Sequence, residues 1–334
     1  MQTTCPLKTL PEMTMTRRFG RSDHSHCRCK NGRRAALLLA LCCVSGVAVG
    51  AADGPPPAAV APAPAPKAAA RPPWDRIVMI GASASAGFTE SEPLGGPNSA
   101  QYRLSRYVEA ALSVPHEPVQ NLANAMFFIQ PEAAGRHQLD QALKSKPTLV
   151  IGVDFLFWFC YGDGPTEKDR LDRFERGLRL LEAVPCPLVL GDIPDASGAS
   201  NDMLAAEQIP SAATRSAANR RLKQWAASRR QVMIVSLSEF MRTALANQRF
   251  TIHGHTVPEG KTRALLQPDK LHPSAFGSAV LALAVLDAFQ STQPSQASAE
   301  IRWNPDEVFR SGFTASLATS HPPAEQGAPA PPEE

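Results

Sequence analysis

Apolar runs alternate with amphipathic segments between Trp74 and Gln290, a pattern typical of proteins whose strands are joined by helices. The apolar runs predict five strands, within Arg76–Gly81, Val119–Ala123, Thr148–Phe159, Pro187–Pro194 and Gln231–Leu237. The remaining segments predict helices at Ser99–Leu112, Asp169–Val184, Ser216–Ser228 and Pro273–Gln290, the last with Pro273 in its first turn. This order indicates an α/β protein with a parallel sheet, which binds ligands beyond the carboxyl ends of its strands.

The segments that flank this domain differ from it in composition. A basic stretch, the apolar run Ala35–Gly50 and then small residues follow one another, which is the order of a secretory signal peptide. The apolar run is shorter than the ~18–20 residues that cross a bilayer. We expect a leader with a signal peptide over 1–52, which directs export to the periplasm or the cell exterior and leaves no stable membrane insertion once removed.

Two further boundaries follow from composition. Residues 53–73 are mostly Pro and Ala and predict an extended linker, which leaves 74–290 as the domain that carries the function. Residues 291–334 form a C-terminal extension that ends in a Pro-rich tail. Trp303, Phe309 and Phe313 within this extension could pack on the domain, but the sequence does not place them.

Charge and cysteine content narrow the class of partner. The chain has 34 Lys and Arg against 31 Asp and Glu, and the basic excess belongs to residues 1–52, since the rest of the chain has 26 basic and 29 acidic residues. The rest of the chain has no basic stripe, which argues against nucleic acid as a partner. Cys160 and Cys186 remain after the leader, and their places after one predicted strand and before the next put them at opposite ends of a parallel sheet, too far apart for a disulfide.

Candidate chemistry lies at two points in the chain. Ser83 follows the first predicted strand, while Asp269 and His272 stand three residues apart before the last predicted helix. A serine becomes a nucleophile when an imidazole takes its proton and a carboxylate orients that imidazole. We therefore expect Ser83, Asp269 and His272 to form a triad, with His272 on an exposed loop.

The two segments that carry these residues, GASAS (Gly81–Ser85) and DKLHPS (Asp269–Ser274), resemble the first and last motifs of the SGNH/GDSL hydrolases. The resemblance implies a three-layer α/β/α sandwich, a flavodoxin-like fold with strand order 2-1-3-4-5. It also implies an esterase mechanism in which Ser83 is the nucleophile, His272 the general base and then acid, and Asp269 its orienting partner.

The sequence departs from the family pattern at three positions. Ala82 stands where the family usually has Asp, and Ala123 is the candidate for a position where the family presents Gly. Asp154 stands where an Asn is expected, and an ionised carboxylate cannot donate a hydrogen bond to an oxyanion. The oxyanion-hole candidates are therefore Ser83, Ala123 and Asp154; either Asp154 is protonated, or it points elsewhere, or another group supplies the third donor.

Other residues have both a functional and a structural interpretation. His253 and His255 suggest a metal pair, but no third ligand cluster accompanies them, and we expect no metal and no cofactor. Asp192 and Asp195 lie at the active end of the predicted sheet, where pocket lining and turn formation explain them equally well. Four aromatic residues predict core, with one ring able to line an acyl or sugar site: Phe155, Phe157, Trp158 and Phe159.

The sequence predicts a secreted serine esterase that hydrolyses an ester or O-acetyl group of a small molecule or carbohydrate. Two alternatives remain open at this point. The same triad could transfer an acyl group to a carbohydrate, because only the acceptor differs, and the altered Asp154 motif keeps a non-catalytic binding protein on the same fold in view. The sequence does not determine the oligomeric state.

Overall fold

The computed structural model describes residues 71–164, 166–292 and 300–320, with side chains up to residue 315. The predicted leader over 1–52, nearly all of the 53–73 linker and the end of the Pro-rich tail lie outside the described residues. Within the described part of the chain, no helix combines the length and the apolar character needed to cross a membrane.

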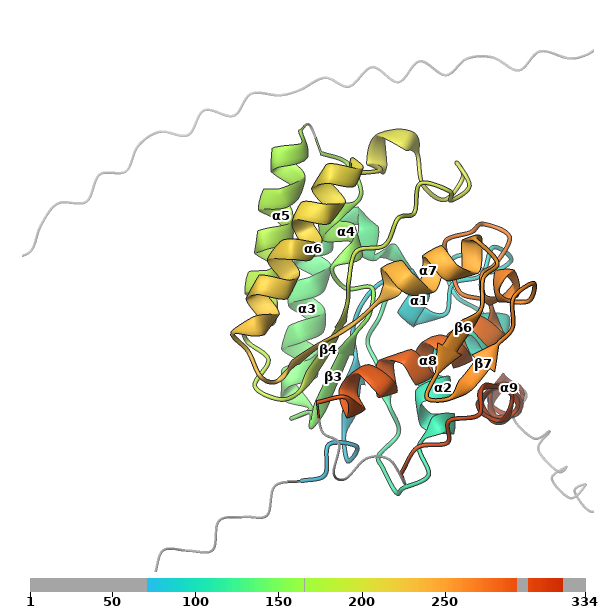
Figure 1. Ribbon diagram of the computed structural model, residues 1–334. Helices are drawn as coiled ribbons and strands as arrows, with labels where there is room; N and C mark the ends of the chain where they lie inside the picture. Colours follow the sequence, from blue (N-terminus) through green and yellow to red (C-terminus); the bar gives the residue numbers. More distant parts are fainter. Residues whose placement is uncertain (1–70, 165, 293–299, 321–334) are drawn as a thin grey trace, which may run out of the picture. The chain divides into compact units, whose positions relative to one another are not determined.

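A five-stranded parallel sheet forms the centre of the domain (Figure 1). Its strands run in the order β2-β1-β3-β4-β5, and their bounds are β1 Ile77–Met79, β2 Gln120–Asn121, β3 Leu149–Gly152, β4 Leu188–Gly191 and β5 Val232–Val235. Val78 pairs with Val150, and Leu188 pairs with both Val150 and Val232. The predicted α/β class and the strand order 2-1-3-4-5 are therefore confirmed.

Helices cover both faces of the sheet (Figure 1). One layer packs α3 against α5 and α5 against α6, with bounds α3 Pro131–Lys144, α5 Glu167–Leu181 and α6 Ala212–Ala227. The other layer packs α2 (Leu104–Ala111) against α8 (Ala275–Gln290). The sheet is buried on both sides, which explains why its central strands read as continuous apolar runs.

Two predicted elements have different bounds in the structure. The run Thr148–Phe159 is not one strand, because β3 ends at Gly152 and the short helix α4 (Phe157–Cys160) follows. Every residue of Leu149–Cys160 is buried, so hydrophobicity does not mark where the strand stops. Pro273 precedes α8 and does not lie in its first turn, since Ser274 is the N-cap and its side chain accepts a hydrogen bond from Gly277 N at 3.0 Å.

Several short elements complete the chain, and most of them lie around the carboxyl ends of the strands. The helices are α1 Ser83–Ala86, α7 Leu237–Leu245 and the single turns Asn98–Tyr102, Ala125–Ile129, Ala206–Gln208 and Thr262–Leu265. The strands β6 (Phe250–Ile252) and β7 (His255–Val257) form an antiparallel hairpin.

The C-terminal extension contributes a helix to the domain. Helix α9 (Pro305–Ser320) packs against α2 and α8, and Val308 on its inner face is fully buried. Phe309 stacks on Tyr107 of α2, with ring centroids 6.4 Å apart. The packed domain therefore extends beyond Gln290, which the sequence takes as its end.

Candidate active site

Ser83 lies where β1 passes into α1, at the carboxyl edge of the sheet. Gly81 has φ +138°, and a Cβ atom there would lie 2.1 Å from Asp154 Oδ1, so only glycine fits this turn. Gln138 of α3 holds the same residue from the other side, because its side chain accepts from Gly81 N at 2.8 Å and donates to Gly81 O at 2.9 Å. The turn that presents Ser83 is thereby fixed by two neighbouring elements.

Ser83 lies near the start of the domain's sequence, and Asp269 and His272 lie near its end. The fold brings these three side chains together. His272 Nε2 lies 2.8 Å from Ser83 Oγ, and His272 Nδ1 lies 2.6 Å from Asp269 Oδ2. His272 is only 5% exposed, so the expectation that it lies on an exposed loop is wrong. Phe88 covers the imidazole, with ring centroids 4.1 Å apart and planes inclined by 28°, which accounts for its burial.

Asp269 is held as a carboxylate by its surroundings. Its Oδ1 accepts hydrogen bonds from Leu271 N at 2.9 Å and His272 N at 3.0 Å. Burial by itself raises the pKa of this carboxyl, but the hydrogen bond and charge of His272 and the two backbone donors outweigh burial, so the pKa is lowered below its usual range. A charged Asp269 can orient the imidazole and stabilise it when protonated.

Asp154 points at the serine turn and accepts hydrogen bonds there. Its Oδ1 accepts from Ala82 N at 3.0 Å and Ser85 Oγ at 2.6 Å, and its Oδ2 accepts from Ser85 N at 3.1 Å. Both oxygens are thus occupied by donors of the segment around Ser83. Of the three alternatives that the sequence leaves open for Asp154, these contacts correspond to the one in which its carboxyl group points elsewhere.

The other two oxyanion candidates differ in their present contacts. Ala123 N donates to Asn121 Oδ1 at 3.0 Å, so this N–H already has an acceptor within its own loop. Among the described residues, no hydrogen bond uses the Ser83 N–H, which lies at the start of α1, where backbone donors have no helical partner. Of the oxyanion-hole candidates, Ser83 is therefore the one whose backbone N–H can donate a hydrogen bond to an oxyanion.

Two pockets meet at the triad. The inner pocket is apolar and includes Phe157, Trp158, Leu237, Phe240, Met241 and Leu281. The outer pocket includes Phe88, Leu94, Met126, Phe128, Asp202 and Gln208. Ser83, Trp158, Leu271 and His272 line both, so the hydroxyl of Ser83 lies at their junction.

Of the four aromatic residues that follow β3, two lie in the core and two lie at the site. Phe155 and Phe159 stack with centroids 5.5 Å apart, and both pack edge-on against Phe127. Phe157 and Trp158 instead line the inner pocket. Two of the four rings therefore lie at the site, where the sequence allows for one.

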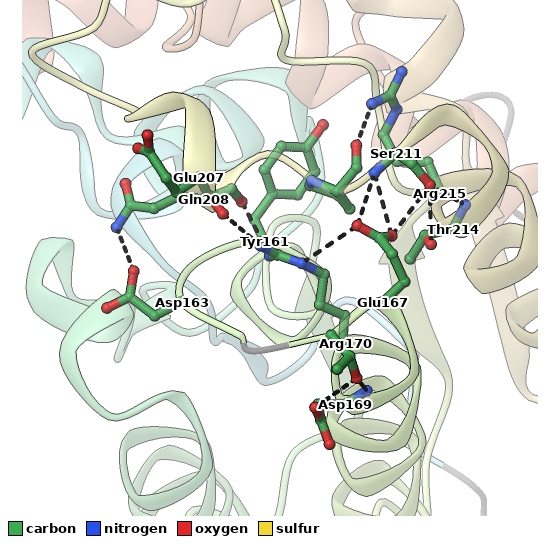
Figure 2. Close-up of polar contacts among 12 residues, drawn as sticks. Tyr161, Asp163, Glu167, Asp169, Arg170, Glu207, Gln208, Ser211, Thr214 and Arg215 are labelled. Atoms are coloured by element: carbon green, nitrogen blue, oxygen red, sulfur yellow. Dashed lines mark hydrogen bonds and ion pairs between the residues drawn. The ribbon is translucent and has the colours of Figure 1, made fainter.

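A polar network braces the loop that walls the outer pocket (Figure 2). The buried guanidinium of Arg170 on α5 donates to the carbonyl oxygens of Gly162, Glu207 and Gln208, and Figure 2 shows it lying between that turn and Glu167. Tyr161 donates to Pro194 O at 2.8 Å, and burial raises the pKa of this phenol to about 12. These contacts fix the backbone on both sides of Asp202 and Met203.

The remaining candidates have structural contacts. Asp192 accepts from Ser238 N at 2.7 Å at the start of α7, and Asp195 pairs with Arg215 at 2.7 Å. His253 stacks on Trp303, with centroids 3.9 Å apart, and lies 3.4 Å from Asp287.

Within the described ranges, no group of three or more His, Cys, Asp or Glu side chains is arranged to hold a metal ion. Cys160 and Cys186 are free thiols.

Three residues of the site are missed by the sequence. Gln138 lies in α3, which the sequence does not predict as a helix; Phe88 reads as an ordinary apolar residue; and Asn121 donates from its side chain to Ser85 O at 3.0 Å. Asn121, a polar residue within the predicted second strand, is the one signal that could have identified a polar contact at the sheet edge.

No model of a known protein family matches the chain, and no curated protein matches it. Similar solved structures include a lipase/acylhydrolase from Enterococcus faecalis, 15% identical with a TM-score of 0.44 over 66% of this chain and 96% of the other. Another is an acetyl-xylooligosaccharide esterase from Geobacillus, 20% identical with a TM-score of 0.42 over 64% of this chain and 93% of the other. A third is a psychrotrophic esterase from Pseudoalteromonas sp., 15% identical with a TM-score of 0.40 over 66% and 100%.

Proposed function

We propose that this protein is a serine esterase that hydrolyses carboxylic esters through an acyl-enzyme on Ser83. One observation carries the proposal: Ser83 Oγ, His272 Nε2, His272 Nδ1 and Asp269 Oδ2 form a continuous chain of contacts of 2.8 and 2.6 Å beside an apolar pocket. Nucleophilic catalysis by a serine requires this order of groups.

In the first half-reaction, Ser83 Oγ attacks the ester carbonyl carbon while its proton passes to His272 Nε2. The carbonyl oxygen becomes an oxyanion in the tetrahedral intermediate. When the intermediate collapses, the bond to the alcohol oxygen breaks and the proton on Nε2 passes to that oxygen. The alcohol leaves, and the acyl group stays as an ester of Ser83.

In the second half-reaction, water takes the place of the alcohol. His272 Nε2 accepts a proton from the water as its oxygen attacks the acyl carbon, and it returns that proton to Ser83 Oγ when the second intermediate collapses. The carboxylic acid leaves and the enzyme is restored. Asp269 accepts a hydrogen bond from Nδ1–H in both halves, which keeps Nε2 free to receive protons.

The oxyanion requires hydrogen-bond donors, and the Ser83 N–H is the donor that we assign to it. Asp154 does not donate in this proposal; it accepts hydrogen bonds from Ala82 N and Ser85 N and so holds the turn around that N–H. Removal of one oxyanion donor typically costs about 10²- to 10³-fold in kcat, so the fixed position of this turn matters to the rate.

Turnover of p-nitrophenyl esters tests the proposal. We expect Ser83→Ala and His272→Ala to lose at least about 10³-fold in kcat, the loss typical of triad members. His116→Ala is the control, because this half-buried histidine lies outside both motifs and lines neither pocket. Folded wild-type protein without ester turnover, or equal rates for wild type and His272→Ala, would exclude the mechanism.

We also propose that the protein is exported, on the basis of the order of basic, apolar and small residues in 1–52. N-terminal sequencing of the protein recovered from outside the cytoplasm should find a start near Asp53. Recovery of a chain that retains Ala35–Gly50 in the membrane fraction would contradict this proposal.

A further inference from the structure

We infer that the ester carries an apolar acyl chain longer than acetyl and that this chain binds in the inner pocket, with Met241 setting the chain length. The inference rests on the proposed function, because it needs Ser83 as the point where the acyl group is attached. It specifies which of the two pockets takes the acyl group and what kind of acyl group fits.

Beyond the triad, the side chains that line the inner pocket include two polar groups, the carboxylate of Asp154 and the indole N–H of Trp158. Of the described residues that line it, the ionisable or hydroxyl side chains are Ser83, His272 and Asp154. The carboxylate of Asp154 is already occupied by Ala82 and Ser85, so none of its oxygens needs a ligand. A sugar carries several hydroxyl groups, and the indole N–H of Trp158 can serve only one of them, so a sugar bound here would lose most of its hydrogen bonds to water, which is costly.

The other walls come from three separate helices and consist mainly of apolar side chains. Phe157 and Trp158 belong to α4, Phe240 and Met241 to α7, and Leu281 to α8. These side chains are buried even though the pocket is open at Ser83: Met241 is 5% exposed and Phe240 2%. Each methylene placed against such walls improves binding by about 4-fold, a gain that acetyl, with a single methyl group, cannot obtain.

The outer pocket suits the alcohol part of the ester. It contains the polar side chains Asp202 and Gln208, and its rim carries exposed apolar groups. Leu94 is 77% exposed, Phe128 43% and Met126 38%, and all three line this pocket. An apolar rim of this kind marks a binding surface and favours substrates with an apolar part over free sugars.

The test compares kcat/KM for p-nitrophenyl acetate and p-nitrophenyl butanoate, because the inner pocket, with a volume of about 50 Å³, has room for a short chain. For the wild type we expect butanoate to be preferred by at least about 10-fold. Met241→Phe narrows the pocket and should lower the butanoate-to-acetate ratio of kcat/KM by about 10-fold. Met241→Ala widens the pocket and should move the preferred chain length upward, so the two variants act in opposite directions.

Met233→Ala is the matched control, because Met233 is also 5% exposed but lies on β5 and does not line either pocket. It can lower stability, yet it should leave the butanoate-to-acetate ratio of kcat/KM unchanged. If Met241→Phe does not fold, the upward shift in Met241→Ala alone supports the inference.

The outcomes separate the two proposals. A wild type that turns over acetate through Ser83 but prefers it to butanoate overturns the acyl-chain inference and leaves the esterase proposal standing. A ratio that moves equally in the Met241 and Met233 variants also overturns the inference. A protein that turns over no ester of either length removes the proposed function, and the inference with it.

Discussion

At the scale of single residues, the contribution of the triad residue Asp269 to the stability of the fold depends on pH. Its pKa is lowered in the folded state, because the contacts of His272 and two backbone N–H groups outweigh the effect of burial. A carboxyl whose folded pKa is depressed stabilises the fold above its unfolded pKa, and this contribution is lost as the pH falls through the folded value. The Asp269 contribution is therefore complete near neutral pH and lost in acid.

We predict that Asp269→Asn lowers kcat by up to about 10⁴-fold at neutral pH, because the amide favours the wrong imidazole tautomer. The same variant should unfold more easily than wild type at pH 6–7, and the difference should shrink below about pH 4, where the wild-type carboxyl begins to take up its proton. Ester turnover and urea unfolding between pH 3 and 7 measure both effects. A difference in unfolding free energy that is constant over this range would contradict the account.

Asp154 is the residue whose role the structure changes most. We predict that Asp154→Asn lowers turnover and destabilises the fold by about 1–3 kcal/mol, since the amide group faces backbone donors that need an acceptor. Asp140→Asn on α3, which is exposed, is the control and should be close to neutral. A rise in turnover in Asp154→Asn, as expected of a restored oxyanion donor, would show that these contacts do not describe its role.

At the scale of elements, the loop between β4 and α6 depends on Arg170. Its guanidinium donates to three carbonyl oxygens, on Gly162, Glu207 and Gln208, while its own side chain is only 4% exposed. Removal of such a group leaves buried carbonyls without a donor, which costs more than the net value of the hydrogen bonds. Arg170 on α5 therefore holds the wall of the outer pocket in its position.

We predict that Arg170→Met lowers the unfolding free energy by about 2–3 kcal/mol and speeds amide hydrogen exchange in residues 197–209. Arg179→Met on the same helix is the control, because Arg179 is exposed. Unchanged exchange in this loop, together with unchanged stability, would mean that the network in Figure 2 does not hold it.

The elements that the sequence reveals are those with large apolar side chains in a regular pattern. All five strands of the sheet are predicted, but α3 is not, because it buries small or polar residues such as Gly135, Gln138 and Ala142. Helix α7 follows β5 without a polar break other than Ser236, so the apolar run hides the boundary.

The site residues that the sequence identifies are likewise those that lie in a recognisable local pattern. Ser83, Asp269 and His272 lie in two short motifs that the order of elements brings to one edge of the sheet, and so they can be identified from the sequence. The direction of the Asp154 carboxylate depends on the backbone of a turn seventy-odd positions earlier in the chain, which no local pattern encodes. The burial of His272 depends likewise on Phe88, a residue that only the fold places on the imidazole.

At the scale of the whole molecule, the segment after α8 belongs to the packed domain. Glu300 accepts a hydrogen bond from the indole of Trp74 at 2.5 Å, and Leu112 bridges Ile301. Helix α9 then packs its inner face on α2 and α8. Residues far beyond the last strand of the sheet therefore form part of the packed domain.

We predict that Val308→Ala lowers the unfolding free energy by about 2 kcal/mol, because two buried carbon atoms are lost and a cavity remains. Thr314→Ala on the same helix is exposed and should be within about 0.5 kcal/mol of wild type. Urea unfolding measures both, and equal midpoints for Val308→Ala and wild type would show that α9 adds nothing to the fold.

The central claim is that Ser83 is a nucleophile activated by His272, and covalent labelling tests it most directly. Folded protein is treated with a fluorophosphonate, and the modified residue is located by peptide mass spectrometry. The account predicts one adduct, on Ser83, that disappears in Ser83→Ala and forms far more slowly in His272→Ala, while Ser85 in the same peptide stays unmodified. A folded wild-type protein that forms no adduct, or forms it on another residue, would contradict the account.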